Sequence, residues 1–368
     1  MEIKVVRLRE ALNLLQPVVP KKPTLSVLTN VLLKDGRAEA TDLETAVALE
    51  LPEADGQCLV PCRKVADLLK RVPGNETLTL EQKGKSLNLA WSGGKASYEA
   101  PSPKDYPPSP KVESKAQRSV DGDTLVAALS SMADYCATAE NRPVLTGVTV
   151  YFGERLEAMA GDGFRMVYQP LPIAFPVDGV DSVVIPARSI QLLGHVWDKT
   201  PRAPTGSSLV ELITSRRQLE LGLGDGMLIV RLGRATLVIK LIAGSPPNWR
   251  QLIPSDVRPE VRVLAPEFER AVRRVQDAAS DSKGILRLSW SEVAMTVSAK
   301  SEENQVETTV PVEAQEPGRV AINISYLLEY LRGKQGLVTM GVKSQQEPVV
   351  FHYGTSPLVI IMPMFVQW

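Results

Sequence analysis

The feature that most constrains the fold of this chain is a set of landmarks that recurs three times in the same order. The middle landmark is a short β-branched strand that meets a Pro or Asn and continues into an amphipathic helix, at 59–72, 183–197 and 320–334. Proline is tolerated in the first turn of a helix, and asparagine is a good N-cap. The recurrence indicates that the chain repeats one supersecondary unit along its length.

Two further landmarks flank the middle one in each third. Amphipathic helices are expected to open the thirds, over 8–19, 123–137 and 266–279. A turn glycine, a strand and a proline stop close them, at 94–101, 233–247 and 354–363.

These landmarks predict an α+β fold built from three similar domains, each with two helices against antiparallel sheets of roughly eight short strands. The domains are expected over 1–117, 118–253 and 254–368. The Pro-rich stretches at 102–115 and 245–256 are interpreted as the linkers between them.

Composition is typical of a soluble globular protein, with 44% apolar and 23% charged residues among 368. No run approaches 18 apolar residues, and the N-terminus lacks the apolar core of a signal peptide, so we expect a cytoplasmic protein without a membrane partner. Three cysteines and two histidines predict neither a disulfide framework nor a metal site, and we expect no cofactor.

Enzyme classes find little support in the sequence. A P-loop is missing, and the glycines at 222–226 read as a hairpin turn. Asp42, Glu44 and Asp162 would suit a metal-dependent nuclease, but they fall at equivalent turns of different repeats, which predicts that they lie apart. Cys62 lacks a plausible histidine base. We therefore expect no catalytic residues.

A resemblance to one family covers essentially the whole chain. It rests on motifs in every third: Pro23-Thr24-Leu25, Asn30, Thr41–Glu44, Arg142–Gly147, Asp162–Met166, Asn323–Leu328 and Ile360–Met364. The chain resembles bacterial DNA polymerase sliding clamps, the beta subunit of DNA polymerase III. The resemblance implies a non-catalytic processivity factor that closes as a head-to-tail homodimer into a ring around duplex DNA. It also implies a polymerase alpha subunit, a clamp loader, other polymerases and repair proteins as partners.

The formal net charge of zero speaks against a simple nucleic-acid binder, whose affinity comes from neutralised phosphates. A ring answers this objection, because a protein that encircles DNA stays on it without tight binding. Its contacts with DNA can then be weak and independent of the base sequence. The basic residues expected to bias the inner wall are Lys21, Lys22, Arg63, Lys64, Lys70, Arg71, Arg142, Arg188, Arg270, Arg273, Arg274, Arg332 and Lys334. Lys22 is the strongest candidate, because it stands where the family uses Arg. For any one of these residues, a solvated face is an equally good interpretation.

The resemblance further implies an apolar groove that binds short extended peptides of the partners. Carried over by position, its residues are Leu145, Gly161, Gly163, Phe164, Arg165, Met166, Pro247, Gln251, Leu252, Asn323, Tyr326, Ile360, Met362, Pro363, Met364, Phe365 and Val366. Methionine suits a site that accepts several peptides. Ile360 could equally fill the core of the last domain, whereas for Met362, Pro363 and Met364 the site is the favoured interpretation over the core. Phe164 and Gln251 depart from common family residues, and Gln367 and Trp368 extend the chain beyond many relatives.

Dimer contacts are expected between an edge strand near 95–100 and another near 297–307. The residues singled out are Lys95, Tyr98, Gln276, Asp277, Glu302 and Glu303. Lysines opposite glutamates would attract each other, and the same charges could instead keep a solvated edge from pairing. The alternative function is a peptide-binding scaffold that shares the groove but never encircles DNA.

Overall fold

A computed structural model describes the chain except for residues 111, 140, 201–216 and 255–259. The described residues fall into two compact units. Unit 1 comprises Met1–Ala133, Phe152–Glu154 and Ile173–Ala243. Unit 2 comprises Asp134–Tyr151, Arg155–Pro172 and Gly244–Trp368.

Unit 1 holds two antiparallel sheets. One has the order β1-β6-β7-β8 and the other β5-β2-β3-β4-β16-β15-β14-β9. The strands are β1 Glu2–Lys4, β2 Asn30–Lys34, β3 Arg37–Thr41, β4 Thr45–Glu50, β5 Gln57–Pro61, β6 Thr77–Lys83, β7 Ser86–Trp91, β8 Gly94–Glu99, β9 Ala116–Asp121, β14 Gln218–Gly224, β15 Met227–Leu232 and β16 Ala235–Lys240. Strand β13, Ser182–Pro186, leads into a helix.

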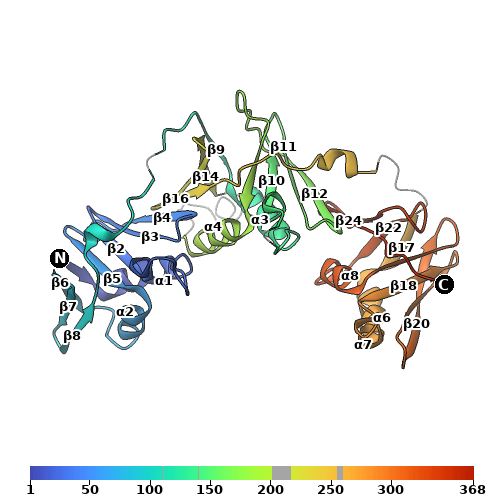
Figure 1. Ribbon diagram of the computed structural model, residues 1–368, viewed down its shortest axis with the longest axis horizontal. Helices are drawn as coiled ribbons and strands as arrows, with labels where there is room; N and C mark the ends of the chain where they lie inside the picture. The colour runs from blue at the N-terminus through green and yellow to red at the C-terminus, as the bar shows by residue number, and fades with distance from the viewer. Residues whose placement is uncertain (111, 140, 201–216, 255–259) are drawn as a thin grey trace, which may run out of the picture. The chain divides into compact units, whose positions relative to one another are not determined.

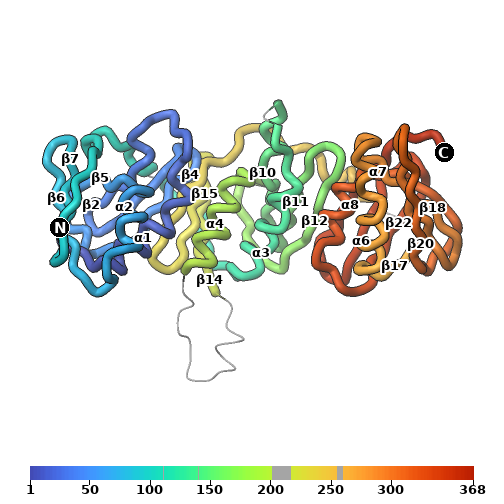
Figure 2. The backbone as a smooth tube through the Cα atoms, turned by 90° about the horizontal axis from the view of Figure 1, so that it is seen from below, coloured from blue at the N-terminus to red at the C-terminus, as the bar shows by residue number. Residues whose placement is uncertain are grey.

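The described helices of unit 1 lie in front of its strands in Figure 2. They are α1 Val5–Leu15, α2 Cys62–Leu69, α3 Gly122–Ala133 and α4 Ala187–Lys199. α1 packs on α2, and α3 packs on α4. In α2 the apolar face, Val65, Ala66 and Leu69, is buried, whereas Arg63 and Lys64 are exposed, so the helical spacing read from the sequence places the core correctly.

Unit 2 contains one long antiparallel arrangement in the order β10-β11-β12-β24-β23-β22-β17-β20-β19-β18-β21. Its strands are β10 Gly147–Tyr151, β11 Leu156–Gly161, β12 Arg165–Leu171, β17 Glu260–Leu264, β18 Ile285–Trp290, β19 Ala294–Lys300, β20 Gln305–Ala314, β21 Gly318–Asn323, β22 Leu337–Gly341, β23 Val349–His352 and β24 Leu358–Ile361. The helices α6 Ala265–Arg274, α7 Gln276–Ser280 and α8 Ile324–Leu331 lie in front of these strands in Figure 2. Asn323 caps α8, because its Oδ1 accepts from the Ser325 N–H at 2.9 Å.

The predicted threefold plan is confirmed by the connectivity. Each third supplies eight strands to the structure (β1–β8, β9–β16 and β17–β24), and the first, sixth, seventh and eighth of each lie side by side in that order. Strand β9 begins at Ala116, so it starts just before the predicted boundary at 117/118, and both domain boundaries remain predictions.

Two strand pairings join successive repeats. The first joint, inside unit 1, pairs β4 with β16. The second joint, inside unit 2, pairs β12 with β24 (Figure 1). Each joint extends a sheet of one repeat with the last strand of the next, so backbone ladders carry both connections.

The described part of the chain has no helix that is long and apolar enough to cross a membrane. Among the same residues, no group of His, Cys, Asp and Glu side chains could hold a metal ion. The three cysteines are free and buried, and burial raises the pKa of the Cys62 thiol to about 11. A thiol in this state is a poor nucleophile at neutral pH.

Candidate partner groove, basic surface and strand edges

A network of polar contacts in unit 2 surrounds Arg165, whose side chain is 7% exposed. Its guanidinium contacts the Glu329 carboxylate at 2.7 Å and the Asp162 carboxylate at 3.3 Å, and donates to the Asp134 carbonyl at 2.7 Å. The rings of Tyr135 and Tyr326 lie against it, each 4.6 Å from Cζ to the ring centroid. Burial acts to lower the pKa of Arg165, but Glu329 and Asp162 hold it above its usual value. Arg165 thus stays charged while it ties β12 to α8.

The turn that precedes Arg165 is shaped by Asp162. Its Oδ1 accepts from the backbone N–H groups of Phe164, at 2.9 Å, and Arg165, at 3.0 Å. Gly163 adopts a φ of 99°, which favours glycine. As a result the Phe164 ring projects from the turn and is 66% exposed. The Phe164 carbonyl accepts from the Met362 N–H at 2.8 Å, so the turn also holds the segment after β24.

Beneath this turn lies an apolar cluster that belongs entirely to unit 2. Its buried members are Leu145, Met159, Met166, Trp249, Val350 and Ile360. The Trp249 indole N–H donates to Thr149 Oγ1 at 3.1 Å, and Met166 pairs with Ile360 across the second joint. Leu145, Met166 and Ile360 therefore form a floor and do not reach the surface.

The exposed apolar side chains of the expected groove surround this floor. Phe365 is 84% exposed, Leu252 53% and Met362 43%. Leu252 and Gln251 lie on the single turn η4, Trp249–Leu252, which the Pro-rich linker forms. Gly161 is packed so tightly that an added Cβ would come within 2.6 Å of the Arg165 carbonyl oxygen, which explains glycine there.

Several of the remaining groove candidates form hydrogen bonds with neighbouring residues. The Pro247 carbonyl accepts from the Tyr151 hydroxyl at 3.5 Å, and Asn323 is occupied as the cap of α8. Met364 donates its N–H to the Ala321 carbonyl at 2.7 Å, and Pro363 and Val366 are half-buried beside it. Sequence reasoning missed Tyr135, Met159, Trp249 and Glu329, of which only Trp249 carried a signal, as a large aromatic in a linker.

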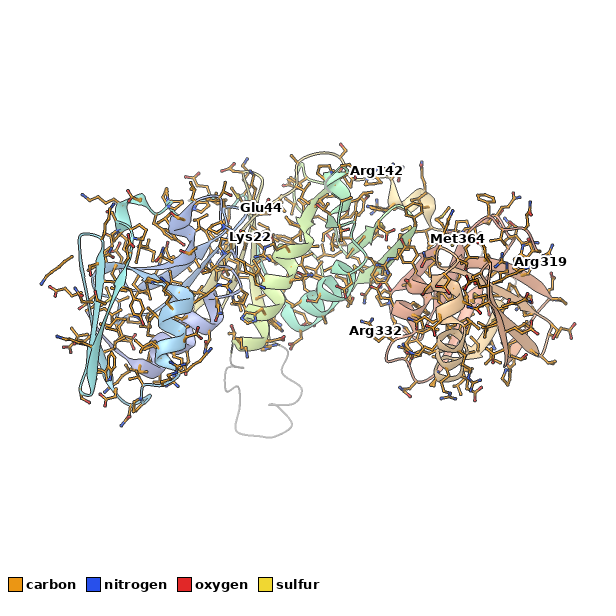
Figure 3. All side chains as sticks on the ribbon, turned by 60° about the horizontal axis from the view of Figure 1, so that its bottom comes forward. Lys22, Glu44, Arg142, Arg319, Arg332 and Met364 are labelled. Atoms are coloured by element: carbon orange, nitrogen blue, oxygen red, sulfur yellow. The ribbon has the colours of Figure 1, made fainter. Side chains whose placement is uncertain are left out.

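In unit 1, four of the predicted basic residues line one recess of about 570 Å³: Lys21, Lys22, Arg63 and Arg188. Asp42 and Glu44 line it as well. Lys22 and Glu44 lie close together in Figure 3.

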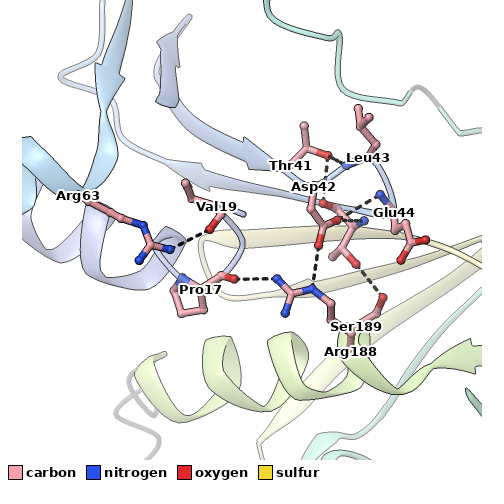
Figure 4. A network of polar contacts seen from close by, with 10 residues as sticks. Pro17, Val19, Thr41, Asp42, Leu43, Glu44, Arg63, Arg188 and Ser189 are labelled. Atoms are coloured by element: carbon pink, nitrogen blue, oxygen red, sulfur yellow. Dashed lines mark hydrogen bonds and ion pairs between the residues drawn. The ribbon is translucent and has the colours of Figure 1, made fainter. Parts of the chain in front are cut away.

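Arg188 and Arg63 are held by neighbours in that recess (Figure 4). Arg188 Nε contacts the Asp42 carboxylate at 3.2 Å, and its Nη2 donates to the Pro17 carbonyl at 3.3 Å. Arg63 donates to the Val19 carbonyl at 3.3 Å. Lys21 and Lys22 are exposed, so they are the freer cations of the recess.

The other predicted basic residues differ in whether their charged groups contact a neighbouring side chain. Lys70 contacts Asp67 at 2.7 Å, Arg273 contacts Glu269 at 2.6 Å, and Arg274 lies 3.4 Å from Thr308 Oγ1. Lys334 is half-buried over the Tyr330 ring and donates to the Tyr330 carbonyl; burial lowers its pKa. The remaining ones are exposed: Lys64, Arg71, Arg142, Arg270 and Arg332.

Two strand edges bear on the expected dimer contact. β8 pairs only with β7 among the described residues, so Lys95 and Tyr98 lie on an outer strand. β20 pairs with β19 through 305–311 and with β17 only through 312–314, which leaves one edge of 305–311 open within the described chain. The expectation that this edge begins at Val297 is wrong, because β19 lies between β18 and β20. Glu302 and Glu303 sit in the exposed turn before β20, and Gln276 and Asp277 begin α7.

Comparisons with known proteins agree along the chain. The family model for the N-terminal domain of the DNA polymerase III beta subunit matches residues 1–109. The beta sliding clamp of Synechococcus elongatus is 25% identical over 370 aligned positions, covering 96% of this chain and 92% of that protein. The beta sliding clamp of Bacillus subtilis is 23% identical, covering 90% and 89%.

Solved structures share the fold over the full length. The DNA polymerase sliding clamp of Pseudomonas aeruginosa superimposes with a TM-score of 0.88 at 22% identity, covering all of this chain and 99% of that one. The sliding clamp of Bartonella birtlesii, solved bound to griselimycin, gives a TM-score of 0.87 at 19% identity with the same coverage.

Proposed function

We propose, from the premise that this chain belongs to the family of bacterial beta sliding clamps, that its groove and strand edges serve a ring-shaped polymerase processivity factor. The observation that carries this function is similarity to beta sliding clamps over 96% of the chain. The protein is a non-catalytic clamp, and DNA and a DNA polymerase are its partners. The scaffold that never encircles DNA is not favoured.

Ring closure is proposed to be a head-to-tail homodimer in which β8 of one copy pairs with the open edge of β20 of the other. The support is geometric, because both strands have an edge without a ladder partner in the described chain. Two different edges on one chain make a heterologous contact, and such contacts close into rings when the rotation permits. Lys95 on β8 and Glu302 and Glu303 before β20 supply opposite charges for this contact.

The groove around the second joint is proposed to bind extended peptides of the polymerase, the clamp loader, other polymerases and repair proteins. Exposed Phe164, Leu252, Met362 and Phe365 offer an apolar rim that the core of unit 2 supports. Griselimycin, which binds the clamp of Bartonella birtlesii, is proposed as a probe of this groove. We also propose that the protein acts in the cytoplasm, and that the exposed basic residues contact DNA phosphates.

The encircling function is tested with DNA topology. The protein is diluted until dimers dissociate, mixed with circular plasmid, concentrated again and separated by gel filtration. A clamp elutes with the circle and is released when a restriction enzyme linearises the plasmid. Equal retention on the linear form would instead indicate ordinary binding and would favour the scaffold.

The dimer contact is tested by charge reversal. Lys95→Glu is expected to weaken the dimer about two- to fivefold, because an exposed ion pair contributes up to about 1 kcal/mol. Combining it with Glu302→Lys and Glu303→Lys is expected to restore the dimer. Sedimentation at low and moderate salt gives the dissociation constants. Reversals that change nothing would place the contact elsewhere.

A further inference from the structure

The C-terminal tail, residues 362–368, is anchored at two backbone positions in unit 2. The Met362 N–H donates to the Phe164 carbonyl at 2.8 Å, and the Met364 N–H donates to the Ala321 carbonyl at 2.7 Å. Ala321 belongs to β21, the last strand in the order of its sheet. The tail therefore passes from the turn at Phe164 to the outer edge of β21.

A third contact lies beyond these two hydrogen bonds. The Arg319 guanidinium stacks on the Trp368 ring, 4.9 Å from Cζ to the ring centroid. Arg319 precedes Ala321 by two residues on β21, so the stacking contact and the Met364 hydrogen bond involve the same strand. Arg319 and Met364 are labelled in Figure 3. Phe365, between the Met364 hydrogen bond and Trp368, is 84% exposed and contributes little to holding the tail.

An unsupported tail of this kind would be expected to fray, because terminal residues rarely keep one conformation unless they are tied down. Met362 and Met364 are themselves part of the tail, and their backbone N–H groups donate to the Phe164 and Ala321 carbonyls, so opening of the tail would displace both residues. The Arg319–Trp368 contact, which lies beyond both hydrogen bonds in the sequence, would limit opening of residues 365–368 away from β21.

We propose that Arg319 and Trp368 are positioning residues that latch the C-terminal tail to β21 and so fix Met362 and Met364 at the groove. This inference rests on the proposed peptide-binding function of the groove. It assigns a role to Trp368, one of the two residues that extend this chain. The latch acts by reducing the freedom of the groove wall before a peptide binds, which lowers the entropic cost of binding.

The latch itself is tested without any ligand, by hydrogen–deuterium exchange of the Met364 amide in the full-length protein. Arg319→Ala and Trp368→Ala are each expected to speed exchange about two- to fivefold, the range that an exposed cation–π contact supports. The double variant is expected to be no faster than either single variant. Trp368→Phe should restore part of the protection, and Gln367→Ala is the matched control. Equal exchange in Trp368→Ala and Gln367→Ala would overturn the latch.

The link to the groove is tested with griselimycin as the probe, measured by calorimetry. Trp368→Ala is expected to weaken its binding about two- to fivefold, and Gln367→Ala to leave it unchanged. Faster exchange with unchanged affinity would overturn the positioning role. If griselimycin fails to bind the unaltered protein, the groove assignment fails instead, and the exchange result still decides whether the latch exists.

Discussion

The two joints between repeats share the same aspartate-capped turn, but the side chains around that turn differ. At the first joint, Asp42 Oδ1 accepts from the N–H groups of Glu44 and Thr45, as Asp162 Oδ1 does from those of Phe164 and Arg165 at the second joint. Each aspartate also contacts an arginine, at 3.2 Å in the first joint and 3.3 Å in the second.

The arginines differ in burial, and this difference separates the joints. The Arg188 side chain at the first joint is 53% exposed, whereas that of Arg165 at the second is 7% exposed between two tyrosine rings. The first joint presents charged groups around a recess, and the second presents exposed Phe164, Met362 and Phe365 over a buried cluster. The same turn can therefore carry a charged surface at one joint and an exposed apolar surface at the other.

The largest effect is expected from removing the buried cation of the second joint. Arg165→Ala leaves the Glu329 and Asp162 carboxylates without their partner, which costs about 3 to 5 kcal/mol of unfolding free energy. Urea denaturation followed by circular dichroism measures the change. Arg188→Ala is the matched variant of the first joint and is expected to cost less than about 1 kcal/mol. Equal costs would mean that burial does not distinguish the joints.

A smaller effect is expected at the buried hydroxyl pair of the first joint. Thr45 Oγ1 and Ser189 Oγ lie 2.7 Å apart, and both residues are about 1% exposed. Thr45→Val leaves the buried Ser189 hydroxyl without a hydrogen-bond partner and is expected to lower the unfolding free energy by about 1 to 3 kcal/mol. The double variant with Ser189→Ala removes both polar groups and should cost less than the sum of the single variants. Additive costs in the same urea experiment would argue against the pair.

The shared turn offers a third comparison. Gly163, with φ 99°, and Leu43, with φ 77°, occupy the same place after the aspartate. Gly163→Ala is expected to lower the unfolding free energy by about 1 to 2 kcal/mol, because an L side chain is strained there. Leu43→Ala keeps the same backbone cost and serves as the control, expected to change stability little since its side chain is 48% exposed. Thermal unfolding of both variants measures the two changes in stability. If Gly163→Ala were no less stable than the unaltered protein, the two turns would tolerate an L side chain equally well.

Particular residues show what the sequence could predict. The amphipathic helix expected within 59–72 is α2, because local periodicity indicates which face of a helix is buried. Arg165 was expected in the groove through the family resemblance, but its contact with Glu329 joins positions 164 residues apart, which no local pattern reports. For the same reason the edge expected near 297–307 began on β19, which pairs on both sides, and only its last residues, 305–307, fall on β20. The DNA, groove and dimer roles of individual residues remain predictions.

The smallest effect distinguishes a free cation from a bound one within the first joint. Lys22 is exposed in the same recess where Arg188 is tied to Asp42 and the Pro17 carbonyl. If both face DNA, Lys22→Ala is expected to reduce the slope of log affinity against log salt by about one. Arg188→Ala is expected to change that slope by less, because the contact with Asp42 already occupies the Arg188 guanidinium and leaves it less available to a phosphate. Titration of a short labelled duplex at several salt concentrations measures both slopes. A larger loss for Arg188→Ala would show that its ion pair opens to meet DNA, and the first joint would then be a binding surface in its own right.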